Sequence, residues 1–298
     1  MLQPANWREF SRYPVVAGTA ALAIAVTCAW WLKLDISVLF ATAEIRRGQV
    51  WRLITTIFPH LGILHLLFNV YWLWVFGALI ERVFGHAKTA LLILFLALGS
   101  SAFDFALDQG GVGLSGVGYG MFGLLWVLSR HDERFHDAID PRTVNLFVAW
   151  FLFCIFTTVT KISPVANVAH AAGAILGALI GLAITNPQRR LAIGAVTVAV
   201  VFFGLWGATL GRPVLNLSGK AGYDEGKWGY QDLLANRNQE AVRWLRDATK
   251  LQPGIAEDWF NLGLAYLRIG NKAAAKSAFE RAHQLKPSEE SYTVPDDN

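Results

Sequence analysis

Seven long apolar stretches, separated by short segments that carry most of the charge, occupy the first 211 residues of the chain. An apolar run of about 18 or more residues is long enough to cross a lipid bilayer as a helix. The predicted spans are residues 15–32, 61–80, 89–107, 113–129, 143–160, 162–188 and 191–211. The fourth is the shortest and is rich in glycine, so it needs neighbouring helices around it. The pattern therefore predicts an all-α fold, a polytopic membrane bundle of seven transmembrane helices.

The first span and the loop after it each need a closer look. Residues 15–32 are also compatible with the apolar region of a signal peptide that is cleaved near residues 41–43. Trp30 and Trp31 at the end of the run favour instead a span that is anchored at the membrane interface. Residues 35–58 mix apolar and charged positions, and we expect this long connection to lie in the interface rather than in water.

Beyond residue 211 the pattern changes to that of a soluble helical module. Residues 212–298 carry 12 basic and 12 acidic side chains, whereas the much longer stretch 1–211 carries 14 and 10. Residues 256–287 resemble the 34-residue tetratricopeptide repeat (TPR) at Trp259, Leu262, Gly263, Tyr266, Ala275, Phe279, Ala282 and Pro287. The second half of the pattern also occurs 34 residues earlier, at Ala241, Leu245, Ala248 and Pro253.

These changes divide the chain into a transmembrane domain at 1–211, a TPR-like module of about two repeats at 220–288, and a disordered tail at 289–298. Two repeats are fewer than the three or so that such modules need for stability. We therefore expect the module to be stabilised by contacts with the membrane domain or with a partner protein. The net charge of +4 includes no basic cluster long enough to bind nucleic acid.

The distribution of Lys and Arg predicts the orientation of the spans, because cytoplasmic segments carry the excess of these residues. With the N-terminus inside, the inner segments hold nine of them: Arg8, Arg12, Arg82, Lys88, Arg130, Arg134, Arg142, Arg189 and Arg190. The outer segments then hold five: Lys33, Arg46, Arg47, Arg52 and Lys161. The N-terminus is therefore predicted to lie inside and, after seven spans, the TPR-like tail outside.

The sequence Gly113-Leu114-Ser115-Gly116 opens the fourth span and contains the first candidate for chemistry. A serine at the start of a helix is often simply an N-cap. As a nucleophile, Ser115 would have glycines on both sides that leave room for a substrate backbone, and the N–H groups of the helix start can hold an oxyanion. The segment is not the nucleophile elbow of α/β-hydrolases, because Val117 occupies the position of the final glycine.

His170, in the sixth span, is the candidate base. A single histidine in a span is commonly a hydrogen-bonded packing residue. However, glycines at 173, 177 and 181 leave one face of its helix almost without side chains, and glycines at 116, 120 and 123 do the same in the fourth span. If these faces pack, His170 reaches Ser115 at hydrogen-bond distance. Tyr119, four residues after Ser115, is then expected to pack on the imidazole.

Polar side chains at the start of the second span form the third candidate. His65 and Asn69 are spaced i, i+4 and face the same way, and His60 lies just before them. They are either hydrogen-bonding groups between helices or donors to a developing oxyanion. No nearby acidic residue completes a ligand set, so neither a metal nor another cofactor is expected. Asp104, near the outer end of the third span, has no basic partner in that span and is expected to be a boundary residue rather than a third catalytic group.

Together these residues resemble the rhomboid family of intramembrane serine proteases, in its bacterial form with six core spans plus one. The resemblance runs from about residue 45 to residue 184. It is carried by Trp51-Arg52, His60, His65 to Asn69, Ala78 to Glu81, Gly113 to Gly116, Tyr119, and Asn167 to Gly173. Each motif is weak alone, but all of them occur in the order and on the spans that the family predicts.

The resemblance implies a role for each residue. Ser115 would be the nucleophile and His170 the general base, in a dyad that has no acidic third member. Binding of the oxyanion or the substrate would fall to His65, Asn69 and Gly113. The supporting residues would be Tyr119, Asn167, Gly173, Trp51 and Arg52.

The predicted function is that of an intramembrane serine endopeptidase, which cleaves transmembrane or juxtamembrane segments of membrane proteins whose helices are unstable. We expect a multi-pass protein of a bacterial cytoplasmic membrane, embedded in the lipid bilayer, whose TPR tail binds a further protein. The alternative is a non-catalytic membrane scaffold or chaperone that binds its partners through that tail. A small-solute transporter is supported only by the polar residues and the short spans.

Overall fold

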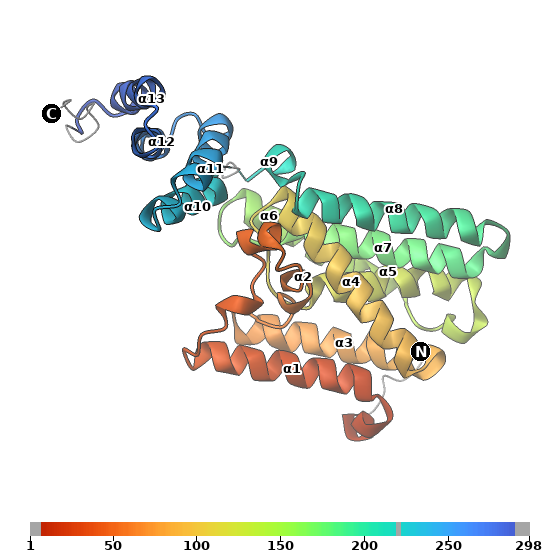
Figure 1. Cartoon of the computed structure of the whole chain (residues 1–298). Helices are drawn as coiled ribbons and strands as arrows, with labels where there is room; N and C mark the ends of the chain where they lie inside the picture. The colour runs from red at the N-terminus through yellow and green to blue at the C-terminus, as the bar shows by residue number, and fades with distance from the viewer. Residues whose placement is uncertain (1–6, 219–221, 290–298) are drawn as a thin grey trace. The chain divides into compact units, whose positions relative to one another are not determined.

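The computed structural model describes residues 7–218 and 222–289, and all regular structure in these ranges is helical (Figure 1). The predicted all-α class is therefore confirmed for these residues. Two compact units make up the chain, residues 1–212 and 213–298, and each is described here by itself. Of the predicted tail at 289–298, all but residue 289 lies outside the described residues, as do residues 220 and 221 of the predicted module.

Seven long helices build the first unit, one in each predicted span. They are α1 (Pro14–Trp31), α3 (Ile63–Phe84), α4 (His86–Leu107), α5 (Ser115–His131), α6 (Pro141–Val159), α7 (Asn167–Thr185) and α8 (Arg190–Ala208). Six of these segments are long and apolar enough to cross a membrane, while α5, at 17 residues, is one residue shorter than α1. The chain is thus a multi-pass integral membrane protein.

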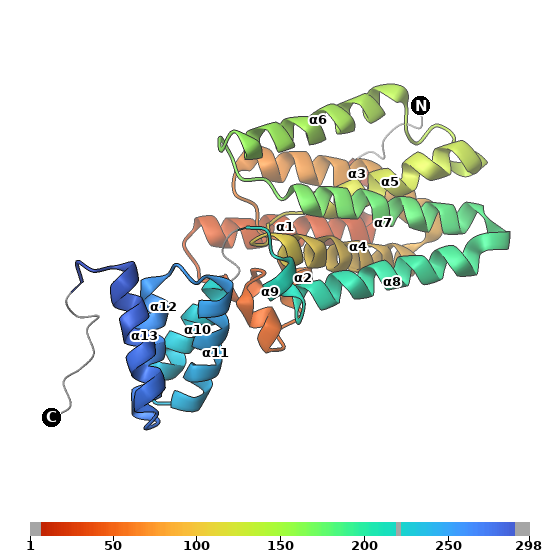
Figure 2. The same cartoon turned by 90° about the horizontal axis from the view of Figure 1, so that it is seen from above.

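Helices α5 and α7 form the central pair of this unit. Helix α4 packs against α7 and α8, and α1 packs against α3. In the view from above, α7 runs between α5 and α8, and α6 lies at the edge of the bundle (Figure 2). Helix α5 therefore packs against α3, α4 and α7, which explains why so short a helix can be mostly buried.

Glycines determine how closely α5 and α7 approach each other. A side chain at Gly173 would collide with the carbonyl oxygen of Gly116, and one at Gly177 would collide with that of Gly120. Because backbone meets backbone at both points, no flexible side chain can move to make room. The predicted packing of the two glycine faces is thus confirmed, and it brings the first turns of both helices together.

The connection from α1 to α3 consists of short helical segments rather than an extended loop. These are η2 (Ser37–Leu39), η3 (Ala43–Arg47) and α2 (Arg52–Thr55). Arg52 is buried, and its Nη1 donates hydrogen bonds to the carbonyl oxygens of Ser37 at 2.7 Å and Phe40 at 3.1 Å. The neighbouring Trp51 leaves about half of its surface exposed. Arg52 therefore holds the connection together from inside, while Trp51 faces outward.

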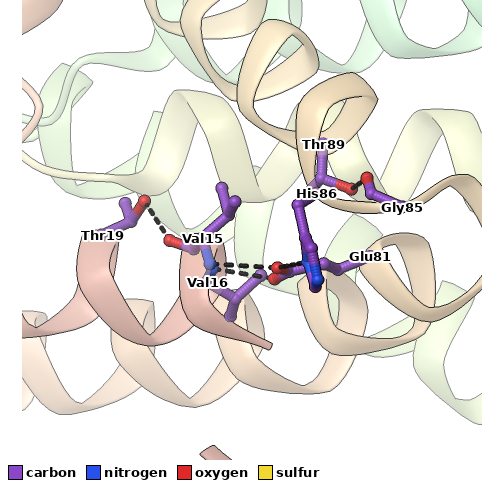
Figure 3. Close-up of polar contacts among 7 residues, drawn as sticks. All are labelled: Val15, Val16, Thr19, Glu81, Gly85, His86 and Thr89. Atoms are coloured by element: carbon purple, nitrogen blue, oxygen red, sulfur yellow. Dashed lines mark hydrogen bonds and ion pairs between the residues drawn. The ribbon is translucent and has the colours of Figure 1, made fainter. Parts of the chain in front are cut away.

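Glu81, in the last turn of α3, fastens the start of α1 (Figure 3). Its buried carboxylate accepts hydrogen bonds from the backbone N–H groups of Val15 at 3.0 Å and Val16 at 2.9 Å. His86 Nδ1 lies 2.6 Å from the same carboxylate. Because the N-cap residue Tyr13 makes no side-chain cap, Glu81 supplies the acceptors that the first turn of α1 lacks.

The described residues of the second unit form four long helices, in two consecutive pairs. They are α10 (Tyr223–Leu234), α11 (Asn238–Leu251), α12 (Ala256–Arg268) and α13 (Lys272–Leu285), after the single turn α9 (Arg212–Leu215). Leu262, Phe279 and Ala282, three of the positions that carry the repeat pattern, are buried. A side chain at Gly263 would collide with the ring of Phe279, so the pattern places glycine where α12 and α13 pack closely.

The second unit also buries a carboxylate with a perturbed pKa. Asp258, in the first turn of α12, is only 9% exposed. Burial, and then the nearby negative charges of Glu257 and Glu225, raise its pKa from 3.8 to about 6. A side chain at Gly226 of α10 would collide with this carboxylate. The folded unit therefore favours the protonated form of Asp258 in mildly acidic solution.

Candidate active site

Ser115 is the first residue of α5, and a tightly held turn leads into it. The preceding Gly113 has a φ of +109°, a conformation that side chains rarely adopt, and its N–H donates to the carbonyl oxygen of Thr56 at 3.2 Å. Glycine is required there for a second reason, because a side chain would collide with the imidazole of His65. The N–H groups of the first turn of a helix have no intrahelical acceptor. The turn therefore presents the Ser115 hydroxyl beside backbone donors.

His170 lies in the first turn of α7 and faces Ser115 directly. Its Nε2 is 2.8 Å from Ser115 Oγ, which is hydrogen-bond distance. The imidazole is 3% exposed, and its Nδ1 is buried with no hydrogen-bond partner among the described residues. With the proton on Nδ1, Nε2 is left as an acceptor for the serine hydroxyl. This is the geometry of a nucleophile and its base.

Tyr119 supports His170 from the next turn of α5. The two rings are stacked, with centroids 4.6 Å apart and planes inclined by 21°. The Tyr119 hydroxyl donates to the carbonyl oxygen of Phe147 on α6 at 3.1 Å, which fixes the ring at its far end. The expected packing of Tyr119 on the imidazole is therefore confirmed.

His60 and His65 lie together next to the turn that leads to Ser115. Their ring centroids are 4.9 Å apart. His60 Nδ1 lies 2.9 Å from the carbonyl oxygen of Phe58, and its Nε2 accepts the N–H of Leu114 at 3.3 Å. His60 thus holds the backbone immediately before Ser115. The sequence places His60 near the second span but gives no sign of this contact with the fourth.

The Asn69 side chain bonds its own helix rather than a group of the dyad. Its Nδ2 donates to the carbonyl oxygen of His65, four residues earlier on its own helix, at 2.9 Å. The residue is 5% exposed. In this arrangement Asn69 stabilises the first turns of α3, and an oxyanion role requires its amide to turn. That role stays a prediction.

Asn167 and Gly173 fix the segment of α7 on either side of His170. Asn167 Nδ2 donates to Thr158 Oγ1 on α6 at 2.8 Å, so the start of α7 is tied to the end of α6. Gly173 provides the close approach to Gly116 described above. Trp51 and Arg52 belong to the connection between α1 and α3, and the Arg52 side chain bonds Gln49, Ser37 and Phe40 rather than the dyad.

Asp104 lies in the last turn of α4, near the end of its span as expected, but the sequence does not show that this residue is buried and bonded. It is 2% exposed. Its carboxylate accepts hydrogen bonds from the N–H groups of Gly111 at 2.6 Å and Ala169 at 3.3 Å. Asp104, Gly111, Ser115 and Ala169 all line one small cavity of about 10 Å³. No periodic pattern signals such a residue, because its partners are backbone groups from distant parts of the chain.

Comparison with known proteins identifies two matching families. Residues 47–187 match the family model described as a rhomboid domain. Residues 256–289 match the model of the tetratricopeptide repeat. The first match contains the whole Ser115 and His170 arrangement, and the second contains α12 and α13.

Three curated relatives illustrate the similarity. The rhomboid protease GluP of Bacillus subtilis is 27% identical over 256 residues, which cover 82% of this chain and 48% of that protein. The rhomboid protease GlpG of Yersinia pseudotuberculosis is 32% identical over 48% of this chain and 51% of its own length. That of Pectobacterium atrosepticum is 33% identical over 46% and 49%. The chain spans about half the length of these relatives.

Proposed function

We propose that this chain, whose residues 47–187 form a rhomboid domain, is an intramembrane serine endopeptidase that cuts membrane proteins with the dyad Ser115 and His170. The observation that carries the proposal is the 2.8 Å contact between Ser115 Oγ and His170 Nε2, within a bundle of helices apolar enough to span a membrane. The similarity to rhomboid proteases of three bacteria supports the same activity.

The first half of the reaction forms an acyl-enzyme. His170 Nε2 takes the proton of the Ser115 hydroxyl while Oγ attacks the scissile carbonyl carbon. The carbonyl oxygen becomes an oxyanion, which the N–H groups at the start of α5 are placed to bind. The imidazolium of His170 then gives its proton to the leaving amine as the C–N bond breaks.

The second half of the reaction restores the enzyme. A water molecule gives a proton to His170 Nε2 and attacks the acyl carbon. The C–O bond to Ser115 breaks, and the serine oxygen recovers the proton from His170. Tyr119 keeps the imidazole plane in place through both halves, because its ring is stacked on that plane and its hydroxyl is bonded to α6.

The substrate must expose a peptide bond that a transmembrane helix normally hides. In a helix the scissile carbonyl is hydrogen-bonded within the segment, and in lipid this bond has no substitute from water. Substrates are therefore membrane proteins whose helices unwind easily near the cut, for example at glycine. The glycines on both sides of Ser115 leave room mainly for a small residue at the scissile position.

The orientation of the protein in the membrane is part of the proposal. The excess of Lys and Arg supports an N-terminus in the cytoplasm of a bacterial cell, and with seven spans the second unit would then lie outside. The four helices α10–α13 would gather substrates or a partner protein on that side. Such a module acts by raising effective concentration rather than by chemistry.

The deciding experiment compares Ser115→Ala and His170→Ala with wild type on a model transmembrane substrate in detergent. We expect each variant to lose cleavage and to lose labelling by a fluorophosphonate probe, and the double variant to be little worse than either. Ser129→Ala is the matched control, because Ser129 lies on the same helix and bonds only the carbonyl oxygen of Trp126 in its own helix. A scaffold or chaperone would show no difference among the five proteins. Cleavage by Ser115→Ala at the wild-type rate would rule out the proposed nucleophile.

A further inference from the structure

A single buried carboxylate connects the two segments that carry the dyad. Asp104 lies in the last turn of α4, a helix that contributes neither Ser115 nor His170. One of its oxygens, Oδ2, accepts the N–H of Gly111, four residues before Ser115, at 2.6 Å. The other, Oδ1, accepts the N–H of Ala169, the residue before His170, at 3.3 Å. The two halves of the dyad are thus tied to one carboxyl group.

The contact with Ala169 provides a cap that α7 lacks locally. The N-cap position of α7 is Ala166, whose side chain cannot accept a hydrogen bond, and Ala169 is the third residue of the helix. The N–H groups of a first helical turn need an external acceptor, and a negative charge there is further favoured by the helix dipole. Asp104, which lies on another helix, supplies both the acceptor and the negative charge. The turn that it holds is the one that carries His170.

The contact with Gly111 fixes the turn into α5 in the same way. Both polar groups of the Gly111 backbone are bonded, the N–H to Asp104 and the carbonyl oxygen to Thr56 Oγ1 at 2.8 Å. A side chain at Gly111 would collide with Ala166, so this turn lies directly against the start of α7. Asp104 therefore bonds two backbones that already touch, and it determines how they lie relative to each other.

Asp104 does not act as the acidic member of a triad. In a triad the acid accepts the Nδ1 proton of the histidine. Here His170 Nδ1 has no hydrogen-bond partner among the described residues, and both carboxylate oxygens of Asp104 are bonded to backbone N–H groups instead. The carboxylate orients the base through the backbone rather than through the ring.

We propose that Asp104 is a positioning residue, which sets the distance between Ser115 and His170 by bonding the backbone on both sides of the dyad. This inference rests on the proposed function of that dyad. A shift of about 1 Å between reacting groups lowers a rate by roughly 10²-fold. Loss of one of the two bonds is therefore expected to lower turnover at least tenfold. The binding of substrate should change much less, because Asp104 is buried and does not face the outside.

The chain offers a matched control in Glu81, another buried carboxylate that receives two backbone N–H groups (Figure 3). Asp104→Asn and Glu81→Gln make the same chemical change, since each replaces one accepting oxygen by an NH₂ group that opposes a backbone N–H. Only the first change lies next to the dyad. Both proteins are measured well below their melting temperatures, and kcat, KM and the rate of fluorophosphonate labelling of Ser115 are determined per folded molecule.

We expect Asp104→Asn to lower kcat and the labelling rate at least tenfold with KM within threefold of wild type, and Glu81→Gln to keep all three near wild type. A second variant, Asp104→Asn with Ala166→Ser, offers α7 a local cap and should recover at least threefold of the labelling rate. Three results would each overturn the proposal. The first is an equal loss in Asp104→Asn and Glu81→Gln, and the second is labelling of Asp104→Asn at the wild-type rate. The third is a double variant that recovers none of the labelling rate. Failure of the proposed function itself would give a different result, in which Ser115→Ala is labelled at the same rate as wild type.

Discussion

A methyl group at position 173 tests whether the approach of α5 and α7 sets the chemistry. Gly173 follows His170 by three residues, and its neighbour Gly116 directly follows Ser115. In Gly173→Ala the new Cβ would lie closer than 3.0 Å to the carbonyl oxygen of Gly116, and real Cβ atoms do not approach so closely. Because the obstacle is backbone, the two helices must separate, by about 1 Å to restore van der Waals contact.

That separation acts directly on the dyad. A 1 Å increase would stretch the 2.8 Å contact between Ser115 Oγ and His170 Nε2 beyond the range of a hydrogen bond. Misplacement of this size costs roughly 10²-fold in rate, which corresponds to about 2.7 kcal/mol of the barrier. Overpacking also lowers the free energy of unfolding, typically by about 1–3 kcal/mol. We therefore expect Gly173→Ala to have a lower melting temperature than wild type and to cleave substrate about a hundredfold more slowly.

The assay is cleavage of a model transmembrane substrate in detergent, with folded protein quantified from its thermal unfolding curve. Gly194→Ala is the matched control, since Gly194 lies on α8 and a side chain there meets nothing within 4 Å. It adds the same methyl group to a helix without moving the dyad, so its rate should equal that of wild type. If Gly173→Ala also kept the wild-type rate, the helix contact would not control the distance between the catalytic groups.

Three further predictions concern other parts of the chain. Asn69→Ala should lower turnover by up to 10²-fold if its amide turns to the oxyanion, and an unchanged kcat with a lower melting temperature would show that it only caps its own helix. Asp258 has a folded pKa of about 6 against 3.8 in the unfolded chain, so the second unit should lose stability as the pH rises from about 4 to 6. Asp258→Asn should remove that loss and stabilise the unit at pH 7 by up to about 3 kcal/mol, measured by hydrogen exchange of α10–α13 in the intact chain; equal protection in both proteins would contradict it. Deletion of residues 222–298 should spare a generic substrate and weaken cleavage of a native one, and protease added outside oriented vesicles should digest the tail; digestion only from the cytoplasmic side would mean that one span is miscounted.

The sequence predicts the helices and the meeting of α5 with α7 because both depend on patterns that recur along the chain. Apolar runs set the spans, and glycines four residues apart mark the surfaces that touch. The pairing of Ser115 with His170 follows from those surfaces once the two helices are known to pack. Such features rest on side-chain type and spacing, which a sequence displays directly.

The contacts of Asp104, His60 and Arg52 could not be predicted in this way. Each side chain bonds backbone atoms, and every residue type has a backbone. Asp104 and Ala169 are 65 residues apart, and the contact between them joins a carboxylate to a backbone N–H. The orientation of the Asn69 side chain cannot be predicted from the sequence either, because a bond to its own helix and a bond across the site would use the same amide.

The bond between Glu81 and the start of α1 also bears on how such a domain can be divided and recombined. The matched rhomboid region begins at residue 47, whereas the donors that satisfy Glu81 are at Val15 and Val16. A protein cut at residue 47 would leave a buried carboxylate without those two partners, which is among the costlier defects a fold can carry. The unit that can be transplanted into another chain is therefore longer than residues 47–187, and a chimaera should keep α1 and α3 from the same parent.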